Sequence, residues 1–537
     1  MRRGWVRPGL GLCALFVLVP HPGGAQQVLG EGCAFEPGTE SAEVQSFATT
    51  RIISSVRPRI RCEDGVVLHA DSLTYYEARG WATLRGNVFY ADSTRSLTAV
   101  RAEYFRQARQ LIANGDSATD VVVTDLEDEG RLTGPTLNYL QRGGGRIEDE
   151  ITLFGGGSAR PRPKARLPAP RPDSAEILRR GEPPTPATPF DVTADRIFLR
   201  GEDFFEAIGE VDGVRDSLTT HSDTLVFDQV IQTLDLRGHA ALVQGTSRID
   251  GRHVRVRLPD GEIHEIEARG EAGLLAPDLD LKAPWIRIAF VDGEVDGLWA
   301  APLHRRAVTT ETPPPGITEE VPSGDQTMTP GDSVDALQPV ARSGRTTIRA
   351  DSLDVETTAG ALEQLVGVGR AHAVWERDSI DVSMLPEIAR EDWMRGDTIT
   401  VTFTPVVEGD SITWVLDRVV AAGNASSLYR LPPDSTSTAG TPAPDDRGAL
   451  RTDSIVGRTD PPSDSTAVPR TGGGIEGAVE TPVARTTPGI HYVVAVRIIL
   501  IFEGGEVERM EVLGLEEGVY LQPRGRARRN RGPGGAS

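Results

Sequence analysis

Few residues of this chain have the types and spacing that chemistry requires. The sequence contains no His-Glu-x-x-His helix, no Walker loop and no Gly-x-Ser-x-Gly elbow. The nine histidines are scattered, and no pair of them has the spacing of metal ligands. Pairs of carboxylates abound in so acidic a chain, so no pair singles out a glycosidase. We therefore expect a protein that is not an enzyme and that binds no metal and no cofactor.

Two short motifs contain residues typical of ligand sites but lack the context or the spacing that such sites require. Gly472-x-Gly474-x-x-Gly477 has the spacing of a dinucleotide fingerprint, but it lies in a Thr-, Pro- and Gly-rich stretch with no strand before it. Asp292-Gly293-Glu294 and Asp296-Gly297 suggest calcium, but they lack the fixed spacing of a calcium-binding loop. We interpret the first motif as linker and the acidic residues as hairpin turns.

The N-terminus has the pattern of an export signal. Basic Arg2 and Arg3 precede an apolar run at 10–19, and Gly23-Gly24-Ala25 is a small-residue cleavage site. We expect a signal peptide at 1–25 that is removed after Ala25. The expected location is then the periplasm, with association to the outer membrane left open.

Cleavage after Ala25 removes Cys13 and leaves Cys33 and Cys62. Two cysteines in an oxidising compartment favour one disulfide, and two free buried thiols are the alternative. Two cysteines without a nearby histidine do not make a zinc site.

The strands that must position any functional residue come from a repeated sequence motif, which we call the repeated phrase. In each copy an apolar residue precedes Ala-Asp, two alternating runs follow around a turn, and the copy closes at a glycine. Clear copies run from Ala70-Asp71 to Gly86, from Ala194-Asp195 to Gly209 and from Ala350-Asp351 to Gly367. Looser copies begin at Ala102-Glu103, Ser222-Asp223 and Gly396-Asp397. A unit of two short strands cannot bury its apolar side alone, so neighbouring units must stack.

The fixed residues of the phrase have structural roles. The Asp stands at the entrance of a strand, where its carboxylate can accept hydrogen bonds from nearby backbone N–H groups. Ala and Gly allow neighbouring strands to approach closely.

Hydrophobic residues alternate with period two, which predicts strands with one buried face. The residues expected to share inner faces are Leu84, Val88 and Tyr90 in one strand, Leu234, Leu236 and Leu242 in another, and Leu365 and Trp375 in a third. A last hairpin should turn at Gly504-Gly505 and place Val494, Val496, Ile498, Leu500 and Phe502 on one face.

Two stretches have helical features. Phe105, Ala108 and Ile112 fit one helix face, but alignment with the repeat makes 102–113 a hairpin, and we expect strands there. The stretch 384–395 predicts a helix, because Pro386 stands near its start and Gly396 follows its end.

Composition divides the chain into β blocks and linkers. We expect an N-terminal segment at 26–63, β blocks at 64–157, 190–305 and 345–430, and a C-terminal hairpin at 490–522. The stretches 158–189, 306–344 and 431–489 are rich in Pro and poor in apolar residues, so burial cannot repay their ordering entropy. We expect linkers there and a disordered basic tail at 523–537. The predicted fold class is all-β, built from stacked antiparallel hairpins.

Several of these motifs are similar to those of the OstA-like (LptA) family of periplasmic lipopolysaccharide-transport proteins. The resemblance rests on Ala70-Asp71-Ser72-Leu73, Leu84-Arg85-Gly86-Asn87-Val88, Ala102-Glu103-Tyr104-Phe105, Ala350-Asp351-Ser352-Leu353 and Gly423-Asn424-Ala425. It implies a twisted β-jellyroll, open at both ends, whose apolar trough carries lipid A acyl chains between the two membranes. The inner-face residues given above would then line the lipid groove.

We therefore expect a periplasmic scaffold that binds and transports lipopolysaccharide or another envelope glycolipid. Its partners would be other components of a transport bridge or of the outer membrane. Exposed end strands would also allow head-to-tail self-association. The formal net charge of −21 argues against nucleic acid as a partner. The alternatives are a non-catalytic structural or adhesion β-repeat protein and a carbohydrate-active enzyme on a β-solenoid.

Overall fold

Antiparallel strands account for most of the chain that the structure describes. The computed structural model describes residues 32–47, 50–63, 65–125, 130–155, 161–167, 188–302, 338–358, 361–376, 385, 387–408, 411–431, 489–503 and 506–521. These residues contain no α-helix, so the prediction of an all-β chain of antiparallel hairpins is confirmed. Among them, no helix has the length and apolar character to cross a membrane. The expected signal peptide, the 472–477 motif and the basic tail lie outside the described residues.

The chain divides into two compact units. The first comprises Met1–Gly344, Arg349–Val366 and Phe403–Trp414. The second comprises Arg345–Ile348, Gly367–Thr402 and Val415–Ser537.

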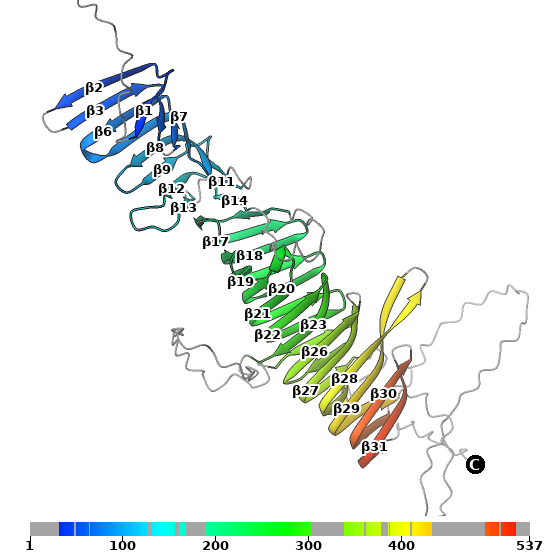
Figure 1. The fold of residues 1–537 in the computed structure, drawn as a ribbon. Helices are drawn as coiled ribbons and strands as arrows, with labels where there is room; N and C mark the ends of the chain where they lie inside the picture. The colour runs from blue at the N-terminus through cyan, green and yellow to red at the C-terminus, as the bar shows by residue number, and fades with distance from the viewer. Residues whose placement is uncertain are drawn as a thin grey trace, which may run out of the picture. The chain divides into compact units, whose positions relative to one another are not determined.

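In the first unit the strands form two walls that share their longest members (Figure 1). The first half of β7 (Trp81–Ala91) pairs with β6 (Ser72–Tyr76), and its second half pairs with β5 (Val67–His69). We call the wall that contains β5 wall A and the wall that contains β6 wall B. Each long strand therefore passes from one wall into the other.

The remaining strands of the first unit follow the same plan. Wall A also contains β1 (Cys33–Phe35), β4 (Arg59–Cys62), β10 (Val121–Asp125), β11 (Arg131–Gly134), β14 (Lys164–Leu167), β15 (Phe190–Thr193) and β24 (Val340–Ser343). Wall B also contains β2 (Ser41–Phe47), β3 (Thr50–Val56), β9 (Gln110–Asn114), β12 (Thr136–Leu140), β13 (Glu150–Phe154), β16 (Arg196–Arg200), β23 (Glu294–Ala301) and β26 (Ser352–Thr358). The shared strands are β7, β8 (Arg95–Phe105), β17 (Phe204–Arg215), β18 (Leu218–Asp228), β19 (Thr233–Gln244), β20 (Ser247–Arg257), β21 (Glu265–Ala276) and β22 (Leu279–Val291). Two 3₁₀ turns, η1 (Glu77–Arg79) and η3 (Pro259–Gly261), interrupt the pattern.

Strand pairing joins the stretches that composition had separated. β13 pairs with β16 in wall B, and β14 pairs with β15 in wall A. The expected blocks at 64–157 and 190–305 are therefore continuous. Residues 164–167 are strand rather than linker, because Ala165 and Leu167 alternate with charged residues and are buried. The same holds for β24 in the stretch 306–344, where Ala341 is buried.

A corner bends four of the shared strands between the walls. Each corner consists of two consecutive residues with positive φ, and the strand register shifts there. The pairs are Gly86-Asn87 in β7, Gly209-Glu210 in β17, Gly238-His239 in β19 and Gly270-Glu271 in β21. Gly86, Gly209 and Gly238 are glycines that close copies of the repeated phrase, and Gly270 is a further glycine of the same kind.

The Asp of the repeated phrase packs against the corner of the next strand. A Cβ on Gly86, whose φ is +71°, would lie only 2.2 Å from Asp71 Oδ2, so glycine is required on both counts. The same Oδ2 accepts a hydrogen bond of 3.0 Å from Asn87 Nδ2. Asp223 and Gly238 repeat the contact. The carboxylate thus holds the corner of the neighbouring strand, a role that the expected bonds to nearby backbone N–H groups did not include.

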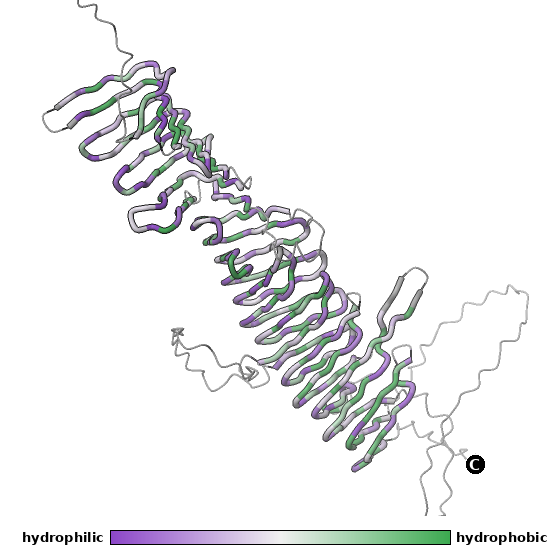
Figure 2. Tube along the Cα trace, in the orientation of Figure 1, coloured by the Kyte–Doolittle hydropathy of each residue, from purple (hydrophilic) through white to green (hydrophobic). Residues whose placement is uncertain are grey.

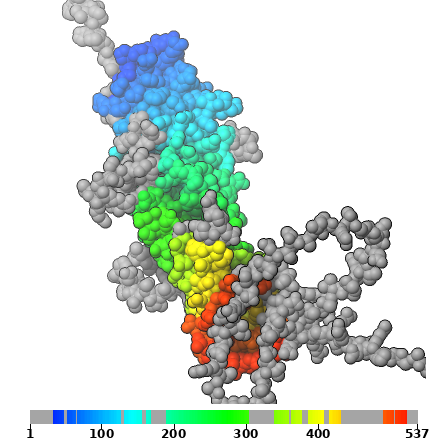
Figure 3. All heavy atoms as spheres, turned by 90° about the vertical axis from the view of Figure 1, so that its right-hand side faces the viewer, coloured from blue at the N-terminus to red at the C-terminus, as the bar shows by residue number. Residues whose placement is uncertain are grey.

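The inner faces of the two walls are apolar and closely packed. All six residues expected to face inward in this unit are no more than 4% exposed: Leu84, Val88, Tyr90, Leu234, Leu236 and Leu242. Figure 2 shows hydrophobic and hydrophilic residues alternating along the strands. Figure 3 shows one outer face of the molecule, where the first unit is coloured from blue to green. The 102–113 stretch is the expected hairpin, formed by β8 and β9.

A disulfide fastens β1, one of the two three-residue strands of wall A. Cys33 and Cys62 are bonded to each other and lie directly opposite in the register of β1 and β4. The bond closes a loop with a sequence separation of 29. In the chain-entropy model a loop of this length contributes roughly 3–4 kcal/mol, which offsets the marginal stability of a three-residue strand.

The second unit draws on six strands. They are β25 (Thr346–Arg349), β27 (Ala361–Trp375), β28 (Asp392–Glu408), β29 (Ser411–Leu431), β30 (Gly489–Glu503) and β31 (Glu506–Leu521), some of which also contribute residues to the first unit. Leu365 and Trp375 are both buried on β27, at 2% and 4% exposure. β30 pairs with β29 on one side and with β31 on the other.

The predicted inner face of β30 is only partly right. Three of the five expected residues are buried, but Val496 is 57% exposed, and Val493 and Ala495 are buried where Val494 and Val496 were expected. The buried face changes between Ala495 and Ile498, where the ladder to β29 shifts register between Ala422 and Ala425.

The predicted helix at 384–395 is wrong. A single 3₁₀ turn, η5 (Glu387–Ala389), is followed by β28 from Asp392. Asp392 Oδ1 accepts hydrogen bonds of 2.8 Å from both the backbone N and Nε of Arg430, and both side chains are buried. This pairing with β29 holds the start of β28 as strand and overrides local helix propensity.

Gly238→Ala is expected to destabilise the protein by about 2–3 kcal/mol. Alanine in the left-handed region costs about 1–2 kcal/mol, and its Cβ would in addition meet Asp223 Oδ2 at 2.2 Å. Gly245 is the matched control, because its φ is +58° and a Cβ there would meet nothing within 4 Å. Gly245→Ala should lose about 1 kcal/mol. Urea unfolding measures both losses, and equal values would contradict the role of the corner contact.

Candidate functional site

Opposite the corners, the two walls end in turns, and these turns meet across what we call the mouth. Wall A contributes the turn at 92–94 between β7 and β8 and the end of β14 at Leu167. Wall B contributes the loop at 141–149 between β12 and β13 and the turn at 201–203 between β16 and β17. Polar side chains and two small cavities occupy this mouth, and no backbone strand ladder crosses it in the described residues of this region.

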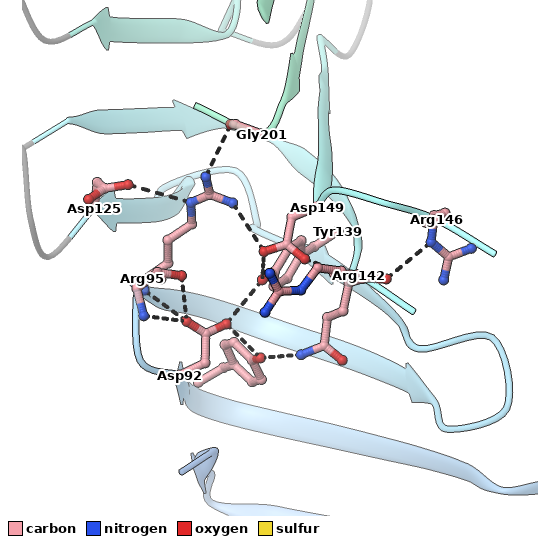
Figure 4. A network of polar contacts seen from close by, with 11 residues as sticks. Asp92, Arg95, Asp125, Tyr139, Arg142, Arg146, Asp149 and Gly201 are labelled. Carbon is pink, nitrogen blue, oxygen red and sulfur yellow. Dashed lines mark hydrogen bonds and ion pairs between the residues drawn. The ribbon is translucent and has the colours of Figure 1, made fainter. Parts of the chain in front are cut away.

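Two tyrosines and two aspartates bridge the mouth, and we call them the Tyr–Asp clasp (Figure 4). Tyr90 OH donates to Asp92 Oδ2 at 2.9 Å on wall A. Tyr139 OH, from wall B, lies 3.0 Å from Asp92 Oδ2 and 3.1 Å from Asp149 Oδ2. The tyrosine rings meet edge to face, with centroids 6.1 Å apart. Because a phenol has one proton, Tyr139 can donate to only one of the two carboxylates at a time.

The turn between β7 and β8 presents Asp92 to the clasp. Asp92 Oδ1 accepts hydrogen bonds from the backbone N–H groups of Thr94, at 2.9 Å, and Arg95, at 2.8 Å. Burial by itself raises the pKa of Asp92, but these bonds and those from the phenols outweigh it and hold the pKa below its usual range. Burial raises the pKa of Tyr90 and of Tyr139, which keeps both phenols protonated as donors.

Two arginines, which we call the staples, reach from wall A to backbone carbonyls of wall B. Arg95 Nη2 donates to Gly201 O at 3.4 Å, and Arg215 Nη1 donates to Gly261 O at 3.1 Å. The Arg95 guanidinium also lies 3.6 Å from Asp125 and 3.7 Å from Asp149. These distances exceed the 2.7–2.9 Å that is typical of strong charged hydrogen bonds. Although its side chain is only 11% exposed, Arg95 is held loosely.

Two apolar cavities lie between the staples. Their volumes are about 60 and 40 Å³, and Leu167 and Phe227 line both. The larger is also lined by Arg95, Arg131, Leu132, Arg166, Leu199, Phe204 and Phe205. The smaller is also lined by Phe190, Arg215, Leu218, Leu234 and Leu258. Each has room for a few water molecules, well below the roughly 300–1,000 Å³ of small-molecule sites. A bulky ligand could therefore enter only if the walls separate.

The residues predicted to line a groove lie at different depths behind this mouth. Leu234 lines the smaller cavity, and Tyr90 belongs to the clasp. The other predicted inner-face residues of the first unit, Leu84, Val88, Leu236 and Leu242, are buried away from both cavities.

Sequence reasoning missed most of the mouth. Arg95, Asp92 and Arg215 stand at hairpin turns, where no hydrophobic periodicity marks them. Tyr139 lies in an alternating run around Leu137, and this alternation was the one available signal for an inward side chain.

Comparison with known proteins adds little to this geometry. No protein-family model matches the sequence, and no curated protein matches it. Among solved structures, the chain is similar to LptH, the LptA-homologous periplasmic component of the lipopolysaccharide transport device of Pseudomonas aeruginosa. The similarity covers 40% of this chain and 96% of that chain, at 12% sequence identity and a TM-score of 0.13. So weak a likeness carries no argument, and the functional inference rests on the walls and the mouth.

Asp92→Asn is expected to reduce the dependence of stability on pH. The pKa of Asp92 is lower in the folded protein than in the unfolded chain, where it is about 3.9. Its ionised form therefore stabilises the fold above that pH, and this contribution is lost as the pH falls through the folded pKa. Melting temperatures at roughly pH 7 and pH 3 should differ less in the variant than in the wild type.

The matched control for this prediction is Asp278→Asn, which changes an exposed aspartate in the turn between β21 and β22. That variant should keep the wild-type difference between the two melting temperatures. The same difference in Asp92→Asn would show that the clasp carboxylate does not stabilise the fold.

Proposed function

We propose that this chain is a non-catalytic periplasmic scaffold that holds acyl chains of lipopolysaccharide or a related envelope glycolipid between its two walls. One observation carries the proposal: two walls with apolar inner faces are continuous at the corners and, in the part of the chain that the structure describes, are joined at the mouth by side-chain contacts. Acyl chains that leave a membrane lose about 0.8 kcal/mol of favourable burial per CH₂. The inner faces of the walls replace this lost burial, because every successive strand adds apolar surface.

Two arginines beside the larger cavity can meet an anionic head group, although Asp125, Glu202 and Asp203 line the same cavity. Arg131 of β11 and Arg166 of β14 lie directly opposite each other, both are exposed, and both line the larger cavity. Like charges directly opposite across strands are destabilising. Asp191 lies 3.8 Å from Arg166 and offsets only part of this repulsion. A phosphate or carboxylate at the mouth would relieve the rest while the acyl chain stays inside.

Each unit has a strand with a free edge, which supports the proposed partners. Within the described residues, β2 pairs only with β3, and β31 pairs only with β30. An unpaired edge strand offers N–H and C=O groups to a further strand. We infer head-to-tail association with a second copy, or pairing with another β-stranded component of a transport bridge or of the outer membrane. The proposed periplasmic location rests on the sequence pattern at 1–25.

A structural or adhesion scaffold that binds only protein is the second candidate. The small volumes of the mouth cavities, about 60 and 40 Å³, favour it. The two candidates differ in whether a lipid ever reaches the inner faces.

Photocrosslinking decides between them. With p-azidophenylalanine in place of Phe227, which lines both cavities, ultraviolet light should link the folded protein to added lipopolysaccharide. The matched control is the same replacement of Phe198, whose neighbour Ile197 is buried, so that Phe198 lies on the outer face of β16. A lipid adduct at Phe227 and none at Phe198 is the expected result. Protein adducts without lipid at both positions would favour the second candidate.

A further inference from the structure

The two sides of the first unit differ in what holds the walls together. At the corners the walls are continuous backbone, which passes through bends such as Gly86-Asn87 and Gly238-His239. At the mouth between Arg95 and Arg215 they are held by side-chain hydrogen bonds and ion pairs. If the walls separate at the mouth, no strand pairing has to break there. If they were to separate at the corners, the strands would have to unbend.

Several contacts across the mouth can be broken while their groups keep a partner on the same wall. Gln141 Nε2 of wall B donates to Tyr90 OH of wall A at 2.5 Å and would lose that bond. Arg95 can release Asp149 and Gly201 and still keep Asp125, which stands on its own wall. Tyr90 keeps Asp92 on wall A.

Wall B keeps its own contacts in the same way. Tyr139 keeps Asp149, and Asp149 Oδ1 also keeps the backbone N–H of Arg142. An unpartnered buried polar group is what makes such openings unfavourable. Apart from the Gln141–Tyr90 and Arg215–Gly261 bonds, the groups of each wall keep a partner when the walls separate, as a two-state latch requires.

Apolar surface lies directly behind this latch. Leu167 and Phe227 line both cavities, and Leu132, Phe204 and Phe205 extend the larger one. Three arginines, Arg95, Arg131 and Arg166, and three carboxylates, Asp125, Glu202 and Asp203, also line the larger cavity. The arrangement matches one acyl chain with a single anionic group at its end, because the apolar residues surround the cavity and the cations lie beside it.

We propose that the mouth between Arg95 and Arg215 is a lateral loading site for a single acyl chain of an anionic amphiphile. Arg95 and the Tyr–Asp clasp are the latch that holds it shut. The inference rests on the proposed lipid-binding function, and it adds where the chain enters and which residues control entry. The latch residues are gating residues, and the apolar residues of the two cavities receive the chain.

The first test weakens the latch. Tyr139→Phe removes the hydroxyl that bridges Asp92 and Asp149 and keeps the ring that packs on Tyr90. Uptake of cis-parinaric acid, a fluorescent fatty acid, should be about fivefold faster than in the wild type, in line with the loss of one hydrogen bond. The matched control is Tyr76→Phe, because Tyr76 stacks on Trp81 on the outer face of wall B. Its uptake rate should equal that of the wild type.

The second test locks the mouth. Gly130 of wall A and Asp203 of wall B both line the larger cavity, so Gly130→Cys and Asp203→Cys can be joined by a cleavable bis-maleimide. The joined protein should take up no cis-parinaric acid, and cleavage of the linker by a reductant should restore uptake. Wild type treated with the same reductant controls for reduction of the Cys33–Cys62 disulfide. The melting temperature of each variant shows that it is folded.

The outcomes separate the two levels of inference. If the wild type binds the fatty acid but Tyr139→Phe and the locked protein take it up at the wild-type rate, the latch is overturned and the lipid-binding function stands. If neither the wild type nor any variant binds the fatty acid or lipopolysaccharide, the proposed function fails and the loading site fails with it. Faster uptake in Tyr139→Phe together with no uptake in the locked protein supports both.

Discussion

The architecture of the first unit depends on a backbone bend that L-residues resist. Each corner places two consecutive residues at positive φ, and at Gly86, Gly209 and Gly238 an aspartate carboxylate packs against the glycine of the pair. At Gly86 that approach leaves no space for a Cβ, and Asn87 adds a hydrogen bond to the same Asp71 oxygen. Because the strand bends there, one strand serves both walls and turns both apolar faces toward each other. A straight strand would leave one apolar face in water.

This bend also decides where the molecule can open. The corners join the walls through backbone and strand pairing, whereas the mouth joins them through Arg95, Arg215 and the Tyr–Asp clasp. On the outside of wall B, oppositely charged residues face each other across successive strands, as Asp235 faces Arg255 and Glu267 faces Arg287. Such cross-strand pairs stiffen a sheet. Deformation should therefore concentrate at the mouth, where the walls share only side-chain contacts.

Much of this fold could be predicted from sequence, because the repeated phrase marks both strand entrances and corners. Alternation correctly placed residues such as Leu84 and Leu236 inside. It failed where a register shift in the ladder to β29 reverses the faces, as at Val496, and where a buried ion pair overrides local propensity, as at Asp392. The mouth could not be predicted, because it forms between turns far apart in sequence. Arg95 and Gly201 are 106 residues apart, and only strand pairing brings them together.

The anionic cargo that we propose is compatible with the acidic composition once the position of the charges is considered. Carboxylates of the walls are largely engaged by neighbouring cations, as in Asp235 with Arg255 at 2.8 Å and Glu265 with Arg287 at 2.6 Å. Arg131 and Arg166, by contrast, face each other beside the larger cavity. The net charge of −21 is a property of the whole chain, whereas an amphiphile at the mouth meets the local field. An apolar interior that ends at paired arginines would retain acyl chains inside and leave their head groups in solvent.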